Sequence, residues 1–370
     1  MKHQTRREIP RNANIRRRDF VGGLAAGLAA LTCADFCQAD DPPPVSAAIE
    51  RAVKKGLDFL ALQQIRESVF DAEGEAGVAV ASRALLAFLA AGHIPDVGKH
   101  GFVVRGAIEW LLRRQNSQGW YGSSERGLRP HVSATTALSQ AYGVESSSER
   151  RLSIHESLGK AVSAILARQT APKPAAEAGG GWGAGQPNGR GENLPLTALA
   201  LFAIRACSGI GFPVPQPVIP RALDFTLRCF DASSGGFGIA PAERADPRST
   251  CAGVVCLFAC DATAANPDRL NSATKFILAH AAEMAAASDS VGGIVPLAAL
   301  KLGSDVWSAV AQPLMARLVK AQQSDGSWLG TKQPGRPEVS RIAATASVLS
   351  VLTMSYPLLP IYQHWTVSNP

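Results

Sequence analysis

The stretch "LVKAQQSDGSW", residues 318–328, decides the fold, because it ends a helix in two glutamines, turns at Asp-Gly and then places a tryptophan. Related stretches are "AIEWLLRRQNSQGWYG" at residues 107–122, "AVSAILARQ" at 161–169 with "GGGWG" at 179–183, and "RALDFTLRCFDASSGGFG" at 221–238. The pattern is therefore an internal repeat, and its helices and spacing are the first properties to establish.

Each copy of the repeat contains one apolar helical stripe. The stripe follows a helical spacing of three and four residues and ends, in its best copies, on a glutamine. The last positions of the six copies lie 42 to 61 residues apart: Gln64, Gln115, Gln169, Phe230, His280 and Gln322. The first and fifth copies are degraded, and His280 merely occupies a glutamine position. Six copies with insertions are typical of a repeat architecture.

A second helical stretch, rich in Ala, Thr and Leu, follows each stripe after a Gly-rich turn. The example "LPLTALALFAIRAC" at residues 194–207 is apolar on nearly every side. Such helices belong inside other helices, so they form an inner layer and the more charged stripes form an outer layer. With no convincing alternating strand pattern, we predict an all-α fold: an α/α toroid of six helical hairpins, a double ring of about twelve helices.

Composition and charge limit the partners. The chain has 370 residues, of which 46% are hydrophobic, and carries a net charge of +7. Residues 1–39 hold seven basic and three acidic residues, which leaves 30 basic and 27 acidic residues for the rest. Because much of the excess charge sits in this leader, no basic patch for nucleic acid is expected on the body of the protein.

The leader has the order of an export signal: "RRRDF" at residues 16–20, an apolar run of about a dozen residues, and small residues up to Ala39. It resembles twin-arginine signals at Arg17, Arg18, Phe20 and Val21. The resemblance implies a bacterial protein exported to the periplasm or outside the cell. We expect a signal peptide at 1–39, a linker at 40–48, the toroid at 49–356 and a tail at 357–370. No stable membrane span is expected after cleavage.

Five cysteines remain beyond the leader, an odd number: Cys207, Cys229, Cys251, Cys256 and Cys260. They lie in apolar helical runs such as "CAGVVCLFAC" at 251–260. We therefore predict buried free thiols rather than a disulfide framework.

The turns resemble a known family. "QQSDGSW" at 322–328 and "QNSQGW" at 115–120 look like the Gln-Trp repeats of squalene and oxidosqualene cyclases, whose α/α toroid is shared with protein prenyltransferase β subunits. The resemblance covers about residues 45–355. It implies that the motif braces one outer helix against the next. The structural positions that it implies are Gln115, Trp120, Gln169, Trp182, Phe237, Gln322 and Trp328.

The catalytic groups of the two families are not carried over with the repeats. Class II cyclases protonate their substrate with Asp-x-Asp-Asp, which the chain lacks; Asp71, Glu73 and Asp246 are the remaining acid candidates, and a solvated turn explains the first two equally. Prenyltransferases place zinc on Asp, Cys and His. Here Asp246 and Cys251 are five residues apart instead of two, and no histidine follows at the required place. We expect neither a metal nor another cofactor.

Residues near the starts of the inner helices line one mouth of the ring if those starts converge. These are Tyr121, His131, Trp182, Arg190, Glu192, Asp246, Arg248, Glu338 and Arg341. Each of them also has a simpler interpretation as a helix cap or a solvated loop residue. Trp182 and Arg190 lie in the long Gly/Pro-rich loop 170–195, which has the composition of a cover over a cavity.

Three functions are consistent with this sequence. The first is an exported toroid that binds an apolar or isoprenoid-like ligand, or a protein partner, without cyclase or zinc chemistry. The second is a divergent enzyme, either a terpenoid cyclase or a carbohydrate-active toroid that uses residues at the mouth. The third is an interaction scaffold. The missing acid cluster and the small number of aromatic residues favour the first, and whether the protein is an enzyme stays open.

Overall fold

The computed structural model describes residues 46–67, 74–122, 127–170, 179–183, 191–286, 293–330, 340–356 and 358–363. The chain divides into two units, Met1–Ala39 and Asp40–Pro370, and all described residues belong to the second. The predicted export signal lies outside the described residues. Among those described, no helix has both the length and the apolar composition that a membrane crossing requires.

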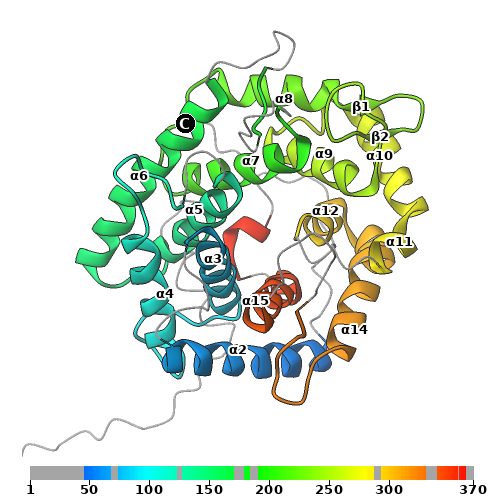
Figure 1. Ribbon diagram of the computed structural model, residues 1–370. Helices are drawn as coiled ribbons and strands as arrows, with labels where there is room; N and C mark the ends of the chain where they lie inside the picture. The colour runs from blue at the N-terminus through cyan, green and yellow to red at the C-terminus, as the bar shows by residue number, and fades with distance from the viewer. Residues whose placement is uncertain are drawn as a thin grey trace, which may run out of the picture. The chain divides into compact units, whose positions relative to one another are not determined.

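Six helices form the outer layer of the second unit (Figure 1): α2 (Ala47–Glu67), α4 (Gly101–Arg113), α6 (Ser148–Thr170), α8 (Val218–Arg228), α10 (Pro267–Ala279) and α14 (Gln312–Lys320). A short helix, α13 (Ser304–Val306), and a π-helical turn, η2 (Trp307–Ala311), lead into α14. These helices are amphipathic. On α2, Leu57 and Leu60 are buried, whereas Arg51 and Lys54 are exposed. The exposed face makes them the outer layer.

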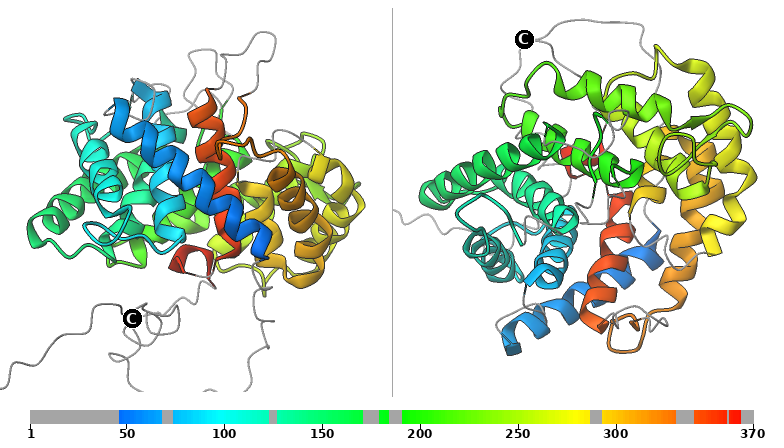
Figure 2. Two further views of the ribbon diagram at one scale, coloured as in Figure 1. Left: turned by 90° about the horizontal axis from the view of Figure 1, so that it is seen from below. Right: turned by 45° about the horizontal axis from the view of Figure 1, so that its top comes forward.

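The inner layer consists of α3 (Gly74–Ala90), α5 (Leu128–Tyr142), α7 (Leu194–Ser208), α9 (Pro247–Ala259), α12 (Ile294–Leu302) and α15 (Arg341–Leu352). Nearly every residue of α7 and α9 is buried, as their apolar sequences require. Side chains of Asn193, Asp246 and Ser340 cap α7, α9 and α15 by accepting a hydrogen bond from a backbone N–H of the first turn. The predicted α/α toroid of six hairpins is confirmed (Figure 2).

Five short elements in this part of the fold were not predicted. Helix α11 (Ala281–Ala286) stands between α10 and α12. Strands β1 (Phe230–Asp231) and β2 (Gly236–Phe237) pair antiparallel within the fourth turn, with Phe230 opposite Phe237. After α15, the chain forms the 3-10 helices η3 (Thr353–Ser355) and η4 (Pro360–Tyr362). Ile361 and Tyr362 are buried, so this part of the predicted tail packs with the toroid.

Glutamine side chains join successive outer helices. The Nε2 group of Gln115 donates to the carbonyl of Ser157 on α6 at 2.8 Å, and Gln169 and Gln64 make the same kind of bond to α8 and α4. Gln322 Nε2 donates to Ala52 O on α2 at 2.8 Å, which joins the last outer helix to the first. These bonds link each of four outer helices to the next, and the last of them closes the ring.

A glycine with positive φ accompanies three of these glutamines. A Cβ on Gly326 (φ +89°) would lie 2.4 Å from the carbonyl oxygen of Lys55, three residues beyond Ala52. Gly119 and Gly180 approach the next outer helix in the same way. The repeat needs glycine here for two reasons, because the backbone is left-handed and because the neighbouring helix leaves no room for a side chain.

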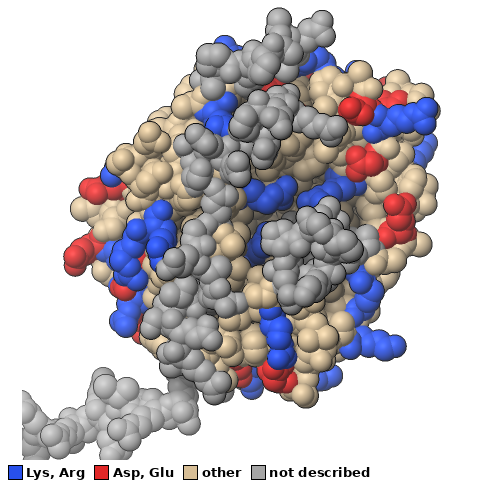
Figure 3. All heavy atoms as spheres, in the orientation of Figure 1, with Lys and Arg blue, Asp and Glu red and all other residues tan. Residues whose placement is uncertain are grey.

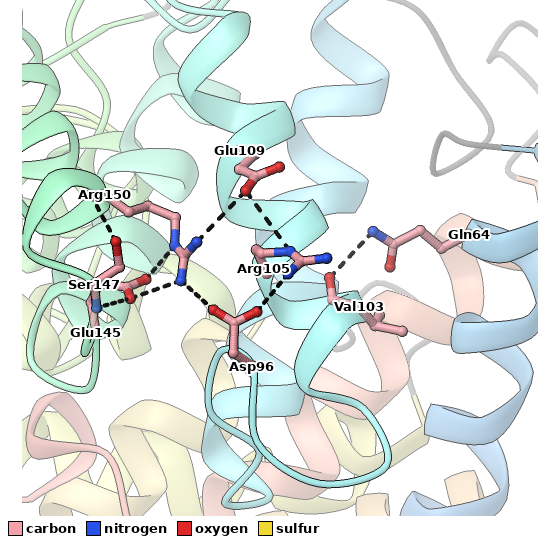
Figure 4. A network of polar contacts seen from close by, with 8 residues as sticks. All are labelled: Gln64, Asp96, Val103, Arg105, Glu109, Glu145, Ser147 and Arg150. Atoms are coloured by element: carbon pink, nitrogen blue, oxygen red, sulfur yellow. Dashed lines mark hydrogen bonds and ion pairs between the residues drawn. The ribbon is translucent and has the colours of Figure 1, made fainter.

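An ion-pair network reinforces one edge of the ring (Figure 4). Arg150 of α6 bonds Glu145 through Nε at 2.7 Å and Asp96 through Nη2 at 2.5 Å, and Asp96 also pairs with Arg105 of α4 at 2.8 Å. The side chain of Glu145 is fully buried. Hydrogen bonding to Glu145 raises the pKa of Arg150. The network ties α4 to α6 beside the glutamine brace.

The five described cysteines are free and buried, as predicted. Burial raises the pKa of Cys207, Cys229, Cys251 and Cys260 to about 12. Their thiols are therefore protonated at neutral pH and serve as small apolar groups in the core.

Candidate functional site

A cavity of about 90 Å³ lies among the inner helices. Residues of α3, α5, α7, α12 and α15 line it, together with Met354 of η3 and Tyr362 of η4. Most of its wall is apolar, with Leu86, Val132, Phe202, Ile294, Leu297 and Met354 as the principal side chains. Its described lining contains no aspartate or glutamate. The volume is small beside the roughly 300–1,000 Å³ of common ligand sites, so it accommodates part of a ligand.

The C-terminal segment contributes to the wall of this cavity. Helix η4 lies within the circumference of the ring (Figure 1) and at one end of it (Figure 2). Tyr362 is buried, and burial raises the pKa of its hydroxyl. Lys301 of α12 donates to the backbone carbonyl of Gln363, which fixes the end of the segment. Burial lowers the pKa of Lys301 to about 8. The inner helices and the C-terminal segment thus line the cavity together.

Two arginines enter the otherwise apolar wall. Arg83 stands in the middle of α3, and Arg129 is the second residue of α5; both are partly buried. Arg248, the second residue of α9, is close enough to repel the charge of Arg129. Burial, and then the charges of Arg248 and Arg83, lower the pKa of Arg129 to about 10. Basic side chains gather around the hollow at the centre of the face in Figure 3.

Tyr121 and His131, predicted at the mouth, form a buried brace instead of a free surface. The backbone N–H of Tyr121 donates to Nδ1 of His131 at 3.1 Å, and His131 Nε2 lies 3.1 Å from Ala161 O of α6. Nδ1 is therefore the acceptor and Nε2 the donor. Both side chains are fully buried, and burial lowers the pKa of His131 to about 4. The imidazole is neutral and structural at physiological pH.

The same brace recurs in the other turns. The N–H groups of Trp182, Phe237 and Trp328 donate to the hydroxyls of Thr197, Thr250 and Thr345 on the following inner helices, at 2.9 to 3.0 Å. The indole N–H groups of Trp182 and Trp328 donate to carbonyls of their own outer helices. These contacts place the two tryptophans and Phe237 in the frame, as the structural positions of the repeat imply.

Tyr121, rather than the predicted Trp120, takes this place in the second turn. Tyr121 follows Gln115 by six residues, as Trp328 follows Gln322, and its hydroxyl bonds Ser157 of α6. Trp120 lies one residue earlier, where Ser327 stands in the last turn. Matching the turns on their tryptophans hides this register, whereas counting from the glutamines reveals it.

The remaining mouth candidates are dispersed. Glu192 is buried, and its backbone pairs with Gly183. Arg341 of α15 binds Asp325 and Ser327 at 2.8 and 2.6 Å, so it secures the last turn. Arg190 and Glu338 lie outside the described residues, as do the acid candidates Asp71 and Glu73.

Asp246 and its neighbours do not fit a zinc site. The carboxylate of Asp246 accepts a hydrogen bond from Ser249 N at 2.9 Å as the cap of α9. Cys251 is buried, with Sγ 3.7 Å from the sulfur of Met284, and Nδ1 of His280 lies 2.8 Å from the carbonyl of Phe276 in its own helix. Across the described part of the chain, no three His, Cys, Asp or Glu residues gather as a metal site requires.

Sequence reasoning singled out Arg248 but missed Arg83, Arg129 and Tyr362. A signal existed for the first two, because each interrupts a nearly uncharged inner-helix sequence. Tyr362 carried no such signal, since nothing in the repeat pattern brings the chain's end back into the ring.

Comparison with known proteins supports the fold. No protein-family model and no curated protein sequence matches the chain. Among solved structures, it is similar to the type II terpene cyclase MstE from Scytonema in its apo form, with a TM-score of 0.53 and 18% identity over 86% of this chain and 100% of that one. A single-residue variant of MstE in complex with its substrate, geranylgeranyl dihydroxybenzoate, gives a TM-score of 0.54 and 16% identity over 84% of this chain and 98% of that one. The chain thus shares the helical toroid fold of these structures.

Proposed function

We propose that the protein binds an apolar, isoprenoid-like ligand within the ring and does not initiate cyclisation by protonating it. The observation that carries this proposal is the apolar cavity among the inner helices, whose described lining offers no carboxylate. A cyclase of this type needs a carboxylic acid held within the cavity to start its reaction. In this chain Asp246, a predicted acid, is engaged in capping a helix.

Similarity to MstE is in keeping with such a ligand, because MstE is a terpene cyclase with a geranylgeranyl substrate. The size of the cavity adds a constraint. At about 90 Å³ it holds the end of a branched chain, and the rest of a longer ligand would extend toward a mouth of the ring. A largely apolar pocket of this kind gains affinity by removing hydrocarbon from water.

Filling the cavity tests the proposal. Geraniol, an uncharged isoprenoid alcohol, is titrated into the purified protein and into Leu297→Trp, whose larger side chain occupies the cavity. Saturable binding that weakens at least about tenfold in the variant is expected, since a few lost methylene contacts suffice for that factor. Leu278→Trp is the matched control, because Leu278 is exposed on α10. Thermal unfolding confirms that each variant is folded.

The proposal fails if geraniol does not bind, or if Leu297→Trp and Leu278→Trp bind it equally. Leu297→Phe, a smaller step, provides the same comparison if the tryptophan variant does not fold. Conversion of geraniol or a longer isoprenoid into a cyclic product would favour the alternative, a divergent terpenoid cyclase.

A further inference from the structure

Three of the five arginines on the inner helices, Arg83, Arg129 and Arg248, interrupt sequences that are otherwise largely apolar. Arg83 and Arg129 line the cavity, and Arg129 and Arg248 occupy the same position, the second residue, on α5 and α9. A positive charge in the first turn of a helix is opposed by the helix dipole. Arg129 and Arg248 therefore destabilise the starts of their helices. We expect a functional reason for this arrangement.

No carboxylate offsets these charges within the described part of the chain. The ion pairs found there involve other residues, and none includes Arg83, Arg129 or Arg248. Arg83 makes one hydrogen bond, from Nη1 to the hydroxyl of Ser347 at 3.2 Å, which holds it toward α15. Arg150, by contrast, is paired with Glu145 and Asp96.

We propose that Arg83 and Arg129, the two arginines of the cavity wall, bind the anionic head group of the ligand whose apolar end occupies the cavity, and that Arg248 at the start of α9 adds to the positive charge there. Guanidinium groups bind carboxylate and phosphate through paired, charge-assisted hydrogen bonds. An anion among three arginines relieves their mutual repulsion, and the same anion is attracted by the helix N-termini beside Arg129 and Arg248.

The position of the arginines defines the ligand class. Arg129 lines the same cavity as Leu297 and Phe202, so one molecule reaches both kinds of surface. The ligand is then a single-chain amphiphile: a branched apolar tail that ends in a carboxylate or a phosphate. The tail part of this inference rests on the proposed function, whereas the anion site stands on the arginines alone.

Four probes separate head from tail. Geranyl phosphate, geranic acid and geraniol share one tail and differ in the head, and inorganic phosphate has no tail. In low-salt buffer the two anionic lipids should bind at least about tenfold more tightly than geraniol, as charge-assisted bonds imply. Which of them binds more tightly identifies the head group as phosphate or carboxylate.

Arg129→Gln is the decisive variant. It should reduce the preference for the anionic lipids over geraniol, measured within the same variant, to within about threefold. Arg51→Gln, an exposed arginine on α2, is the matched control and should keep the wild-type preference. Since Arg129→Gln removes repulsion, it should melt no lower than wild type; Arg248→Gln repeats the test at the neighbouring position.

Each outcome distinguishes the two proposals. Geraniol binding as tightly as the anions, or an unchanged preference in both arginine variants, overturns the head-group site and leaves the apolar site standing. Binding of inorganic phosphate that is lost in Arg129→Gln, without binding of any tail, supports the arginine site and refutes the apolar ligand. If none of the four probes binds, both proposals are refuted.

Discussion

His131 shows how one residue can replace another type in a repeated frame. It is the fourth residue of α5, as Thr197 and Thr250 are of α7 and α9, and like them it accepts a backbone N–H from the preceding turn. The larger imidazole also reaches across to Ala161 O on α6. The second turn is therefore braced to an additional helix. The brace also places a titratable imidazole in the core.

The buried imidazole makes stability dependent on pH. His131 has a pKa of about 4 in the folded protein and about 6.5 when unfolded, so the unfolded chain binds more protons between these values. Stability is full above pH 6.5 and falls as pH decreases toward 4, by about 1–2 kcal/mol at pH 5. His131→Thr, which restores the hydroxyl of the other turns, should lose less stability between pH 7.5 and 5.

Urea unfolding at the two pH values measures this difference. His93 is a second contributor, because burial lowers its pKa to about 4, so His131→Thr should retain part of the loss. His155→Gln, at an exposed position of α6, should keep the wild-type difference. An equal loss of stability in His131→Thr and wild type would show that the imidazole is not buried as described.

At the scale of the elements, the glutamine brace determines how strongly neighbouring outer helices are joined. Gln322 Nε2 donates to Ala52 O and to Gly326 O at 2.8 and 2.9 Å. Gln322→Met keeps the length of the side chain but leaves both carbonyls without this donor, which should cost about 1–3 kcal/mol. Gln323→Met is the control, since Gln323 makes only an exposed contact within the turn.

Unfolding by denaturant compares these two variants. A cost for Gln322→Met no larger than that for Gln323→Met would mean that the ring is closed by apolar packing alone. The fourth turn shows that packing can join neighbouring outer helices. Phe230 replaces glutamine there, and the guanidinium of Arg269 on α10 lies 5.6 Å from the centre of its ring.

The glycine of the turn yields a separate prediction. Gly326→Ala combines an unfavourable left-handed backbone with a Cβ 2.4 Å from Lys55 O, so α2 must move or the turn must distort. Gly303→Ala has a similar φ, +100°, but nothing lies within 4 Å of its Cβ. The first should lower the melting temperature by several degrees more than the second, the difference being the cost of the clash. Equal shifts would assign the whole effect to the backbone.

At the scale of the whole molecule, the sequence was sufficient to predict the ring of helices but not the cavity within it or the residues that line that cavity. Six apolar stripes, four of which end on glutamine, predict six outer helices. The apolar sequences between them predict the inner layer, because periodicity reports which face of a helix is buried. Register within a turn needs tertiary contacts, and so Tyr121 was predicted at the mouth of the ring while Trp120 was assigned to the frame.

The candidate site was harder to predict for a physical reason. A cavity is formed by residues from several helices that are far apart in the chain, such as Leu86, Phe202, Leu297 and Tyr362. Residues that precede the inner helices were predicted to converge, but Asp246, His131 and Arg341 are occupied in caps and braces. The arginines that do face the cavity lie within the helices, one or more residues beyond the caps.

Native mass spectrometry tests the central claim most directly. The protein is incubated with a total lipid extract of its host, its intact complexes are weighed, and any adduct is extracted and identified. We expect a one-to-one adduct of an isoprenoid-like chain with an acidic head group, which Leu297→Trp and Arg129→Gln both take up less than wild type. A protein that keeps its bare mass throughout, or that takes up only uncharged lipids unaffected by either substitution, would contradict it.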